Sequence, residues 1–317
     1  MGAALEATGR PIVYSCSWPA YIGSNESEKP FDTFIMDGCN LWRNWDDIQC
    51  GWGSLGSIID HWGDWGSVLA PWAGPGHWHD ADMLLIGNGC ISEDEERTQM
   101  AIWSIIASPL IMGNDMRNVS AASKAILMNA AAIAVNQDAL GQQGLRLDNS
   151  SAAPAQRWAR TLANGDVAVA LYNKNGGPPS APCPVWNFTA KGYEECCGPS
   201  PCFSDLTEAA AKAKCCADES CAGFSFDPAT NSGCFKSDTN CGFTPSSTYV
   251  GYDKPHFTPS PGAPVDITIA FADVNLVGAV DVYDIWAQRS LGSFTGSYTA
   301  KAVPHHGTAF LRLSRSA

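Results

Sequence analysis

The sequence predicts an α/β region followed by an all-β region that carries a disulfide-rich insert. Residues 10–144 alternate short β-prone runs with helical runs, which is the pattern of a parallel α/β architecture. Beyond residue 144, strand-like runs separated by turn signals predict an antiparallel β-domain. Nine of the 13 cysteines lie between Cys183 and Cys241, which predicts a separate, stapled module.

The first region contains signals for both strands and helices. Three short apolar runs predict strands, at 11–15, 83–86 and 110–112. Apolar residues at helical spacing predict a helix over 54–62. Ser92 and Glu95 form a capping box that opens a second helix, and Ser120 caps a third, which ends near Met128. At about 30 residues per βαβ unit, this region holds about four βα units, whereas a closed eight-stranded barrel needs about 250 residues.

The second region contains two clear strand signals, at 166–172 and 308–313. The cysteine block lies between them and is flanked by Pro-rich stretches, as is typical of a module inserted into a loop. We therefore divide the chain into three parts: a partial α/β region at 1–144, a β-domain at 145–182 and 255–317, and an inserted module at 183–254.

Composition limits the partners and the compartment. The net charge of −13 argues against a nucleic-acid partner, and no apolar run is long enough to span a membrane. The cysteines lack the recurrent Cys/His pairs of metal sites, so they favour disulfides formed in an oxidising compartment. Four glycosylation sequons agree, at Asn25, Asn118, Asn149 and Asn187. Because the first residues do not read as a signal peptide, we expect the natural protein to begin upstream of Met1.

The segment 41–47, Leu-Trp-Arg-Asn-Trp-Asp-Asp, places charged side chains among tryptophans. Arg43 and Asp47 are four residues apart and can converge on one ligand, while indole rings offer apolar faces on which sugar rings stack. Charges beside so much apolar surface cost free energy unless they have a partner. The alternative interpretation is a surface ion pair, worth about 0–1 kcal/mol.

A second dense motif covers residues 73–83. Its Gly-Pro-Gly turn is followed at once by His77, His79, Asp80 and Asp82. Two histidines and two aspartates in so short a stretch are conceivable metal ligands, but carboxylates beside tryptophan suit sugar hydroxyls as well. We therefore predict neither a metal nor another cofactor.

Three motifs follow one another along the chain: Ser-Cys-Ser-Trp-Pro-Ala-Tyr at 15–21, Cys-Asn-Leu-Trp-Arg-Asn at 39–44 with Asp47, and the 73–83 motif ending in Asp-Met. In this order they resemble the family of retaining α-galactosidases and α-N-acetylgalactosaminidases. Segments 107–112 and 135–141 are similar too, and the resemblance covers about residues 8–180 and 265–313. It implies the C-terminal half of a (β/α)8 TIM barrel, beginning before the fifth strand, followed by an antiparallel β-sandwich that carries the disulfide-rich insert.

The resemblance also implies roles for single residues. Asp47 matches the general acid/base, and Arg43 matches the residue that holds the sugar's 2-substituent. The other matched positions are sugar contacts at Asp82 and Met83, a specificity loop with Ser17, Trp18, Ala20 and Tyr21, and a disulfide between Cys16 and Cys39. The chain has His-Asp-Ala-Asp-Met at 79–83 where the family usually has Asn-Asp-Pro-Asp-Met, a departure that concerns the turn and not the aspartates.

The family's nucleophile is an aspartate in a Lys-x-Asp context on the fourth barrel strand, which we expect to precede residue 1. The segment 35–39, Ile-Met-Asp-Gly-Cys, superficially resembles that strand, but it lacks the lysine. Asp37 is therefore predicted to be an ordinary helix or loop residue. With one of the two carboxyls that retention requires, this chain is predicted to be truncated at its N-terminus and to show no turnover alone.

Two positions predict specificity. Galactosidases of the family usually have glutamate where this chain has Ser17, and Ala20 replaces a bulkier residue. Small side chains leave room for an N-acetyl group, and the missing carboxylate would have accepted a hydrogen bond from a 2-hydroxyl. Both features favour α-N-acetylgalactosamine. The alternative is an α-galactosidase proper in which the two positions have drifted.

We therefore expect an enzyme, a retaining glycoside hydrolase acting on terminal α-galactosyl or α-N-acetylgalactosaminyl glycans. The alternative from another class is a non-catalytic carbohydrate-binding protein. The insert, with Cys-Ala-Gly-Phe-Ser-Phe at 221–226 after a short helix, resembles PAN/apple modules, which bind proteins or carbohydrates. A stapled loop without a ligand is the other interpretation of the insert. The family suggests a homodimer and a secreted or lysosomal/vacuolar location.

Overall fold

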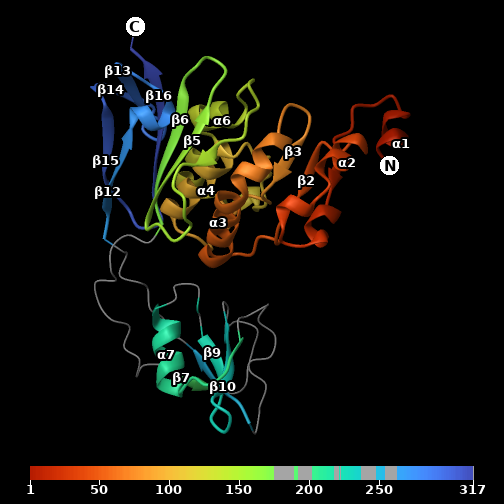
Figure 1. The fold of residues 1–317 in the computed structure, drawn as a ribbon, viewed down its shortest axis with the longest axis vertical. Helices are drawn as coiled ribbons and strands as arrows, with labels where there is room; N and C mark the ends of the chain where they lie inside the picture. The colour runs from red at the N-terminus through yellow and green to blue at the C-terminus, as the bar shows by residue number, and fades with distance from the viewer. Residues whose placement is uncertain are drawn as a thin grey trace. The chain divides into compact units, whose positions relative to one another are not determined.

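The computed structural model describes residues 1–174, 189–191, 202–217, 221, 223–236, 248–253 and 263–316. The chain divides into two compact units, one made of Met1–Gly177 with Pro264–Ala317 and the other of Pro178–Ala263 (Figure 1). None of the helices in the described residues is long and apolar enough to cross a membrane.

A parallel sheet of short strands lies in the first unit. Its strands are β1 Ser15–Cys16, β2 Leu41–Arg43 and β3 Trp78–Asp80, in the order β1-β2-β3. Of the predicted run 11–15, only Ser15 is in a strand, because the Tyr14 amide donates to the Asn40 side chain (2.9 Å). The strands are thus parallel, as predicted, but β2 and β3 lie outside the apolar runs that predicted strands.

The predicted strands at 83–86 and 110–112 are wrong as strands, since they are reduced to one parallel bridge between Leu84 and Met112. The amide of Leu85 donates to a glutamine side chain of the following helix (2.8 Å) instead of to a neighbouring strand. An amide that is satisfied by a side chain cannot extend a ladder, so pairing stops after one residue.

The predicted helices are present, and one more follows them. The helices of the first unit are α1 Gly2–Glu6, α2 Phe31–Met36, α3 Trp52–Leu69, α4 Glu93–Ile105, α5 Ala121–Leu127 and α6 Ala130–Asn136. Its short 3-10 helices are η1 Trp18–Ile22, η2 Glu26–Glu28, η3 Ala70–Trp72, η4 Met116–Asn118 and η6 Phe271–Val274. The capping box of Ser92 and Glu95 opens α4, and Ser120 caps α5. The sequence did not predict α6, which is capped by Asn129. Asp37 is the C-cap of α2, an ordinary helix end as predicted.

The β-domain forms two antiparallel sheets. In the larger one the described strands are β4 Leu145–Arg146, β5 Ala155–Thr161, β6 Val167–Asn173, β13 Ala279–Asp284, β14 Arg289–Thr295 and β16 Thr308–Arg315, in the order β14-β13-β16-β6-β5-β4. In the smaller one, β12 Val265–Ala270 pairs with β15 Ser297–Val303. The predicted strands at 166–172 and 308–313 are confirmed by β6 and β16.

Strand β6 is buried on both faces. Ala168, Ala170 and Tyr172 belong to the core formed with α3 and α4, while Val169 and Leu171 belong to a second core formed with β12 and β16. Helices α3 and α4 lie between the parallel strands and this antiparallel sheet (Figure 1). The parallel α/β region and the β-domain therefore share one apolar layer, which supports α3 and α4, the helices that follow β2 and β3.

The second unit has its own small core and sheet. Its described elements are β7 Thr189–Lys191, β8 Cys202–Phe203, α7 Glu208–Ala217, β9 Gly223–Asp227, β10 Ser232–Lys236 and β11 Val250–Asp253, with strand order β7-β11-β9-β10-β8. Phe224, Phe226 and Phe235 pack in the core. Disulfides join Cys202 to Cys234 and Cys215 to Cys221. Cys183, Cys196, Cys197 and Cys241, which the sequence places in the stapled module, lie outside the described residues.

Candidate active site

Charged side chains gather where β2 and β3 end. Arg43 is the last residue of β2 and lies opposite Asp80, the last residue of β3. Parallel strands present their carboxyl ends at the same edge, which is where ligand-contacting residues of α/β barrels are found. The loops that follow carry Asp47 and Asp82, so all four residues come from one edge of the sheet.

Arg43 is the centre of this cluster. Its Nη2 lies 2.8 Å from Asp82 Oδ2 and 3.1 Å from Asp47 Oδ1, and it also donates to the Asp46 carbonyl (2.9 Å). The Asp82 side chain is 11% exposed, whereas the Asp47 side chain is 79% exposed. The predicted Arg43–Asp47 pair is therefore present, and a second, buried carboxylate shares the same guanidinium nitrogen. One of the two acids faces solvent and is open to a ligand.

Both oxygens of Asp82 are occupied. Oδ2 accepts from the Ile48 amide (2.7 Å) as well as from Arg43, and Oδ1 accepts from the Met83 amide (2.7 Å). Its backbone is in the left-handed region at φ 80, a conformation that costs on the order of 1–3 kcal/mol for a residue other than glycine. The Trp103 indole, which donates to the Asp82 carbonyl (2.8 Å), helps to hold it there. Asp82 thus orients Arg43 and the Asp47 loop and is not a free nucleophile.

Asp80 and His79 are buried neighbours. Their pKa values move in opposite directions, and both shifts favour the neutral form of the side chain. Burial raises the pKa of Asp80 to about 6, although the Asp82 amide and the Arg43 charge oppose that rise. Burial lowers the pKa of His79 to about 4. Trp42 Nε1 donates to His79 Nδ1 (2.8 Å), and His79 Nε2 lies 2.9 Å from the Leu69 carbonyl, so the ring is neutral with its proton on Nε2. Both ring nitrogens are therefore already engaged.

The metal interpretation of the 73–83 motif gains no support from these contacts. Within the part of the chain that the structure describes, no three His, Cys, Asp or Glu side chains converge as metal ligands do. The His77 ring stacks on Trp42 (centroids 6.3 Å apart). The motif instead supplies carboxylates and packed rings to the strand ends.

Replacement of Asp80 by Asn should change the pH dependence of stability. The carboxyl has a pKa near 3.8 when unfolded and about 6 when folded. Its contribution is therefore fully present below pH 3.8 and is lost as pH rises through 6. We expect the unfolding free energy of wild type minus that of Asp80→Asn to fall by on the order of 3 kcal/mol between pH 4 and pH 7. Urea unfolding at several pH values measures this difference.

The comparison of wild type with Asp80→Asn is needed because the titration of His79 changes the unfolding free energy with pH in the opposite direction. Its stabilising neutral form is fully present above pH 6.5 and is lost as pH falls through 4. The two residues thus offset each other in wild type. A difference between wild type and Asp80→Asn that is constant from pH 4 to 7 would show that Asp80 does not titrate in this way.

A buried polar network beneath the cluster was missed by the sequence reasoning. Glu26 accepts from Lys29 Nζ (2.8 Å) and from Asn44 Nδ2 (3.1 Å), and its Oε1 lies 2.8 Å from His61 Nε2. Lys29 also donates to the Asn44 carbonyl. Burial alone would raise the pKa of Glu26, but the hydrogen bonds from His61 and Lys29 outweigh it and lower the pKa. Through Asn44, this network fixes the backbone directly after Arg43.

Only spacing could have hinted at this network. Glu26 and Lys29 stand at i and i+3 in a polar stretch, which normally indicates a solvated loop, and nothing in that pattern announces burial. Their burial depends on His61 and Asn44, which come from other segments.

The predicted specificity loop follows β1. The Cys16–Cys39 disulfide, the pair implied by the resemblance, joins β1 to the segment before β2. η1 begins directly afterwards and packs beside β2. Trp18 is 44% exposed, and its ring makes a T-shaped contact with Phe34 (centroids 4.4 Å apart). The other members are Ser17 and Tyr21, which are exposed, and Ala20, which is half-buried.

The structure thus brings Arg43, Asp47 and Asp82 together directly. Among the described residues, no hydrogen bond or ion pair links these three residues to the side chains of the η1 loop or of Met83. Met83 follows Asp82 in the chain and is exposed. Except for the half-buried Ala20, these side chains are exposed, and a ligand would have to connect them to the cluster.

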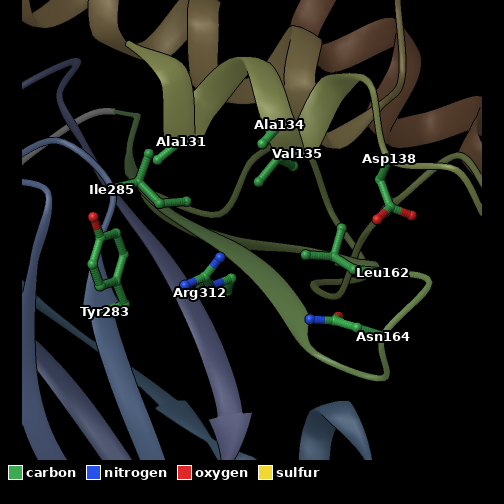
Figure 2. Close-up of a pocket in the computed structure, with 9 residues that line it drawn as sticks. All are labelled: Ala131, Ala134, Val135, Asp138, Leu162, Asn164, Tyr283, Ile285 and Arg312. Carbon is green, nitrogen blue, oxygen red and sulfur yellow. The ribbon is translucent and has the colours of Figure 1, made fainter.

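A small pocket lies elsewhere, between α6 and the strands β13 and β16. Its volume is about 110 Å³. Figure 2 shows Arg312 beside Tyr283 below the helix, with the guanidinium 5.0 Å from the ring centroid. Asn164 donates to Asp166 (2.9 Å), and Asp138 accepts from the Ala163 amide (2.9 Å), so these two side chains already have partners. None of the predicted site residues lines this pocket.

Two family models and several known proteins match parts of this chain. Residues 1–138 match the family model for alpha galactosidase A, and residues 258–313 match that for the alpha galactosidase C-terminal beta sandwich domain. The chain is 52% identical over 179 residues to alpha-N-acetylgalactosaminidase of Gallus gallus, covering 56% of this chain and 44% of that protein. It is 43% identical over 205 residues to alpha-galactosidase A of Homo sapiens, covering 64% and 46%.

A solved structure agrees with the fold. Alpha-galactosidase I of Mortierella vinacea matches all of this chain and 62% of its own, with a TM-score of 0.63 and 23% identity. The predicted fold class, part of a TIM barrel followed by an antiparallel β-sandwich, is thereby confirmed. The chain spans less than half the length of the two curated relatives named above.

Proposed function

Since the chain belongs to the α-galactosidase (melibiase) family, we propose that the natural protein containing it is a retaining glycoside hydrolase that removes terminal α-linked galactose-type residues. The observation that carries this proposal is the contact of Arg43 Nη2 with both Asp47 and Asp82 at the ends of parallel strands. A solvent-facing carboxylate held by a fixed cation suits proton transfer to a leaving oxygen.

In this mechanism Asp47 is the general acid and then the general base. It protonates the glycosidic oxygen in the first step and takes a proton from water in the second. Arg43 orients it and holds the sugar's 2-substituent, while Asp82 fixes Arg43 and the Ile48 amide. Because both Asp82 oxygens are occupied, Asp82 is not the nucleophile of this proposal.

The substrate we propose is terminal α-linked N-acetylgalactosamine. Ser17 is small and exposed, and Ala20 is half-buried in the middle of the adjoining 3-10 helix η1. The named Gallus gallus relative, which is called an alpha-N-acetylgalactosaminidase, is more similar in sequence than the human alpha-galactosidase A. The second candidate, an α-galactosidase proper, is favoured by that human relative.

A secreted or lysosomal location is part of the proposal. It is supported by disulfides at Cys16–Cys39 and Cys50–Cys90, which form and persist in oxidising compartments. The second compact unit, with its separate core, is proposed to bind a protein or carbohydrate ligand. A homodimer stays a prediction from the family.

Substrate competition tests the proposed function. The natural protein is given p-nitrophenyl α-N-acetylgalactosaminide and p-nitrophenyl α-galactoside separately, and kcat/KM is measured for each. We expect turnover of both glycosides, with a preference for the first because Ser17 and Ala20 leave room for the N-acetyl group. Preference for the galactoside would contradict the proposed specificity. The absence of turnover of both substrates would contradict the proposed enzymatic activity.

A further inference from the structure

The segment that carries Asp47 has no regular structure of its own. Residues 44–51 connect the end of β2 to the start of α3 without a helix or strand. Asp47 lies in the middle of this loop with its side chain largely exposed. A carboxylate on an irregular, exposed loop has no intrinsic reason to keep one position, so its placement depends on what fixes the loop.

Two hydrogen bonds hold the backbone of the loop after Asp47. Ile48 N donates to Asp82 Oδ2 (2.7 Å), and Gln49 N donates to Ser54 Oγ (2.8 Å). These two bonds orient the backbone after Asp47. Neither is deeply buried, and exposed hydrogen bonds open readily in local fluctuations.

A disulfide from Cys50 to Cys90 supplies a covalent tie at the same point. Its Cα atoms are 5.5 Å apart and 40 residues apart in sequence. Cys50 follows Ile48 and Gln49, so the cross-link lies directly beside the hydrogen bond to Asp82. Cys90 belongs to the loop after β3, which also carries Asp82. The disulfide therefore joins the two loops that Arg43 bridges through its ion pairs.

The partner side of this disulfide is firmly anchored. Gly87 N donates to Glu96 Oε1 of α4 (2.8 Å), and Ser92 is the N-cap of α4 with a complete capping box. Cys90 itself packs against the main core. The cross-link thus ties an irregular loop to a rigid base.

We propose that the Cys50–Cys90 disulfide is a positioning cross-link that holds the Asp47 loop in register with Asp82. This inference rests on the proposed role of Asp47, but it makes a structural claim that can fail independently. Cys50 is exposed and Cys90 is half-buried, whereas Cys16 and Cys39 are buried. Reduction of this bond in the folded protein would release the loop while the other disulfide of the first unit stays intact.

Hydrogen–deuterium exchange of a Cys50→Ser/Cys90→Ser variant tests the claim. We expect amide exchange in 44–51 to accelerate at least about tenfold, because local opening no longer strains a cross-link. Exchange in α4 should stay unchanged. The matched control is Cys202→Ser/Cys234→Ser, which removes a disulfide of the other compact unit and should leave 44–51 unchanged. If the first variant does not fold, wild type under mild reductant replaces it.

Two readouts separate positioning from simple stabilisation. With ¹⁵N-labelled isoleucine, the Ile48 amide signal should lose the downfield shift of a carboxylate-bonded proton, as it should in Asp82→Asn. In the active natural protein, kcat should fall more than KM changes. Unchanged exchange in 44–51, or equal acceleration there and in α4, would overturn the proposal. The exchange result tests the positioning role of the disulfide even if wild type shows no turnover. The lack of turnover would contradict only the proposed function.

Discussion

Replacement of Asp47 by Asn should lower kcat/KM of the natural protein by about 10²–10⁴. The exposed carboxylate is the proposed proton donor and acceptor, and an amide can do neither. Arg43 would keep a polar partner at the same place, so the loop should stay close to its present position. The measurement is steady-state kinetics with an α-linked N-acetylgalactosaminide whose leaving group is an alkyl alcohol, which needs protonation.

The neighbouring residue provides the matched control. Asp46 is also an exposed carboxylate, but its backbone carbonyl, and not its side chain, contacts Arg43. Asp46→Asn removes the same charge one position away and should leave activity within a few-fold of wild type. Comparable losses in the two variants would mean that charge, and not proton transfer by Asp47, supports the reaction. An Asp47→Asn protein with near-normal turnover would remove Asp47 from the mechanism.

The second large effect concerns specificity. The double substitution Ser17→Glu/Ala20→Leu should shift the ratio of kcat/KM values toward the galactoside by at least about a hundredfold. The new carboxylate accepts a hydrogen bond from a 2-hydroxyl, and the larger side chain occupies the space of an N-acetyl group. The same pair of p-nitrophenyl substrates measures the ratio.

Two single variants separate these contributions. Ser17→Ala removes the hydroxyl without adding an acceptor and should leave the preference unchanged. Ala20→Leu alone should disfavour the N-acetyl sugar without improving the galactoside. A folded double variant with the wild-type ratio would show that the η1 loop does not contact the 2-substituent.

The sequence predicts the parts of this site whose signals are local. Arg43 and Asp47 are four residues apart, and the structure joins them at 3.1 Å. The capping box of Ser92 and Glu95 is likewise a local pattern, and it opens α4 as expected. Contacts between neighbours along the chain can be predicted from residue type and spacing.

Contacts between distant segments could not be predicted in this way. The sequence offered Asp82 as a sugar contact by resemblance, but its occupied oxygens depend on Ile48, 34 residues earlier. The Glu26–His61 pair, 35 residues apart, likewise has no signal in the sequence. The prediction of a strand at 83–86 was wrong because the Leu85 amide donates to the side chain of Gln99 on α4 and not to a neighbouring strand. In each case the outcome depends on tertiary packing and not on local propensity.

The stereochemistry of the released sugar tests the central claim most directly, namely that Asp47 is the acid/base of a retaining site. ¹H NMR of the natural protein acting on p-nitrophenyl α-N-acetylgalactosaminide distinguishes the anomer that is formed first. Two successive displacements predict that the α-anomer appears first and then mutarotates. Initial release of the β-anomer, or no release of sugar, would contradict the account.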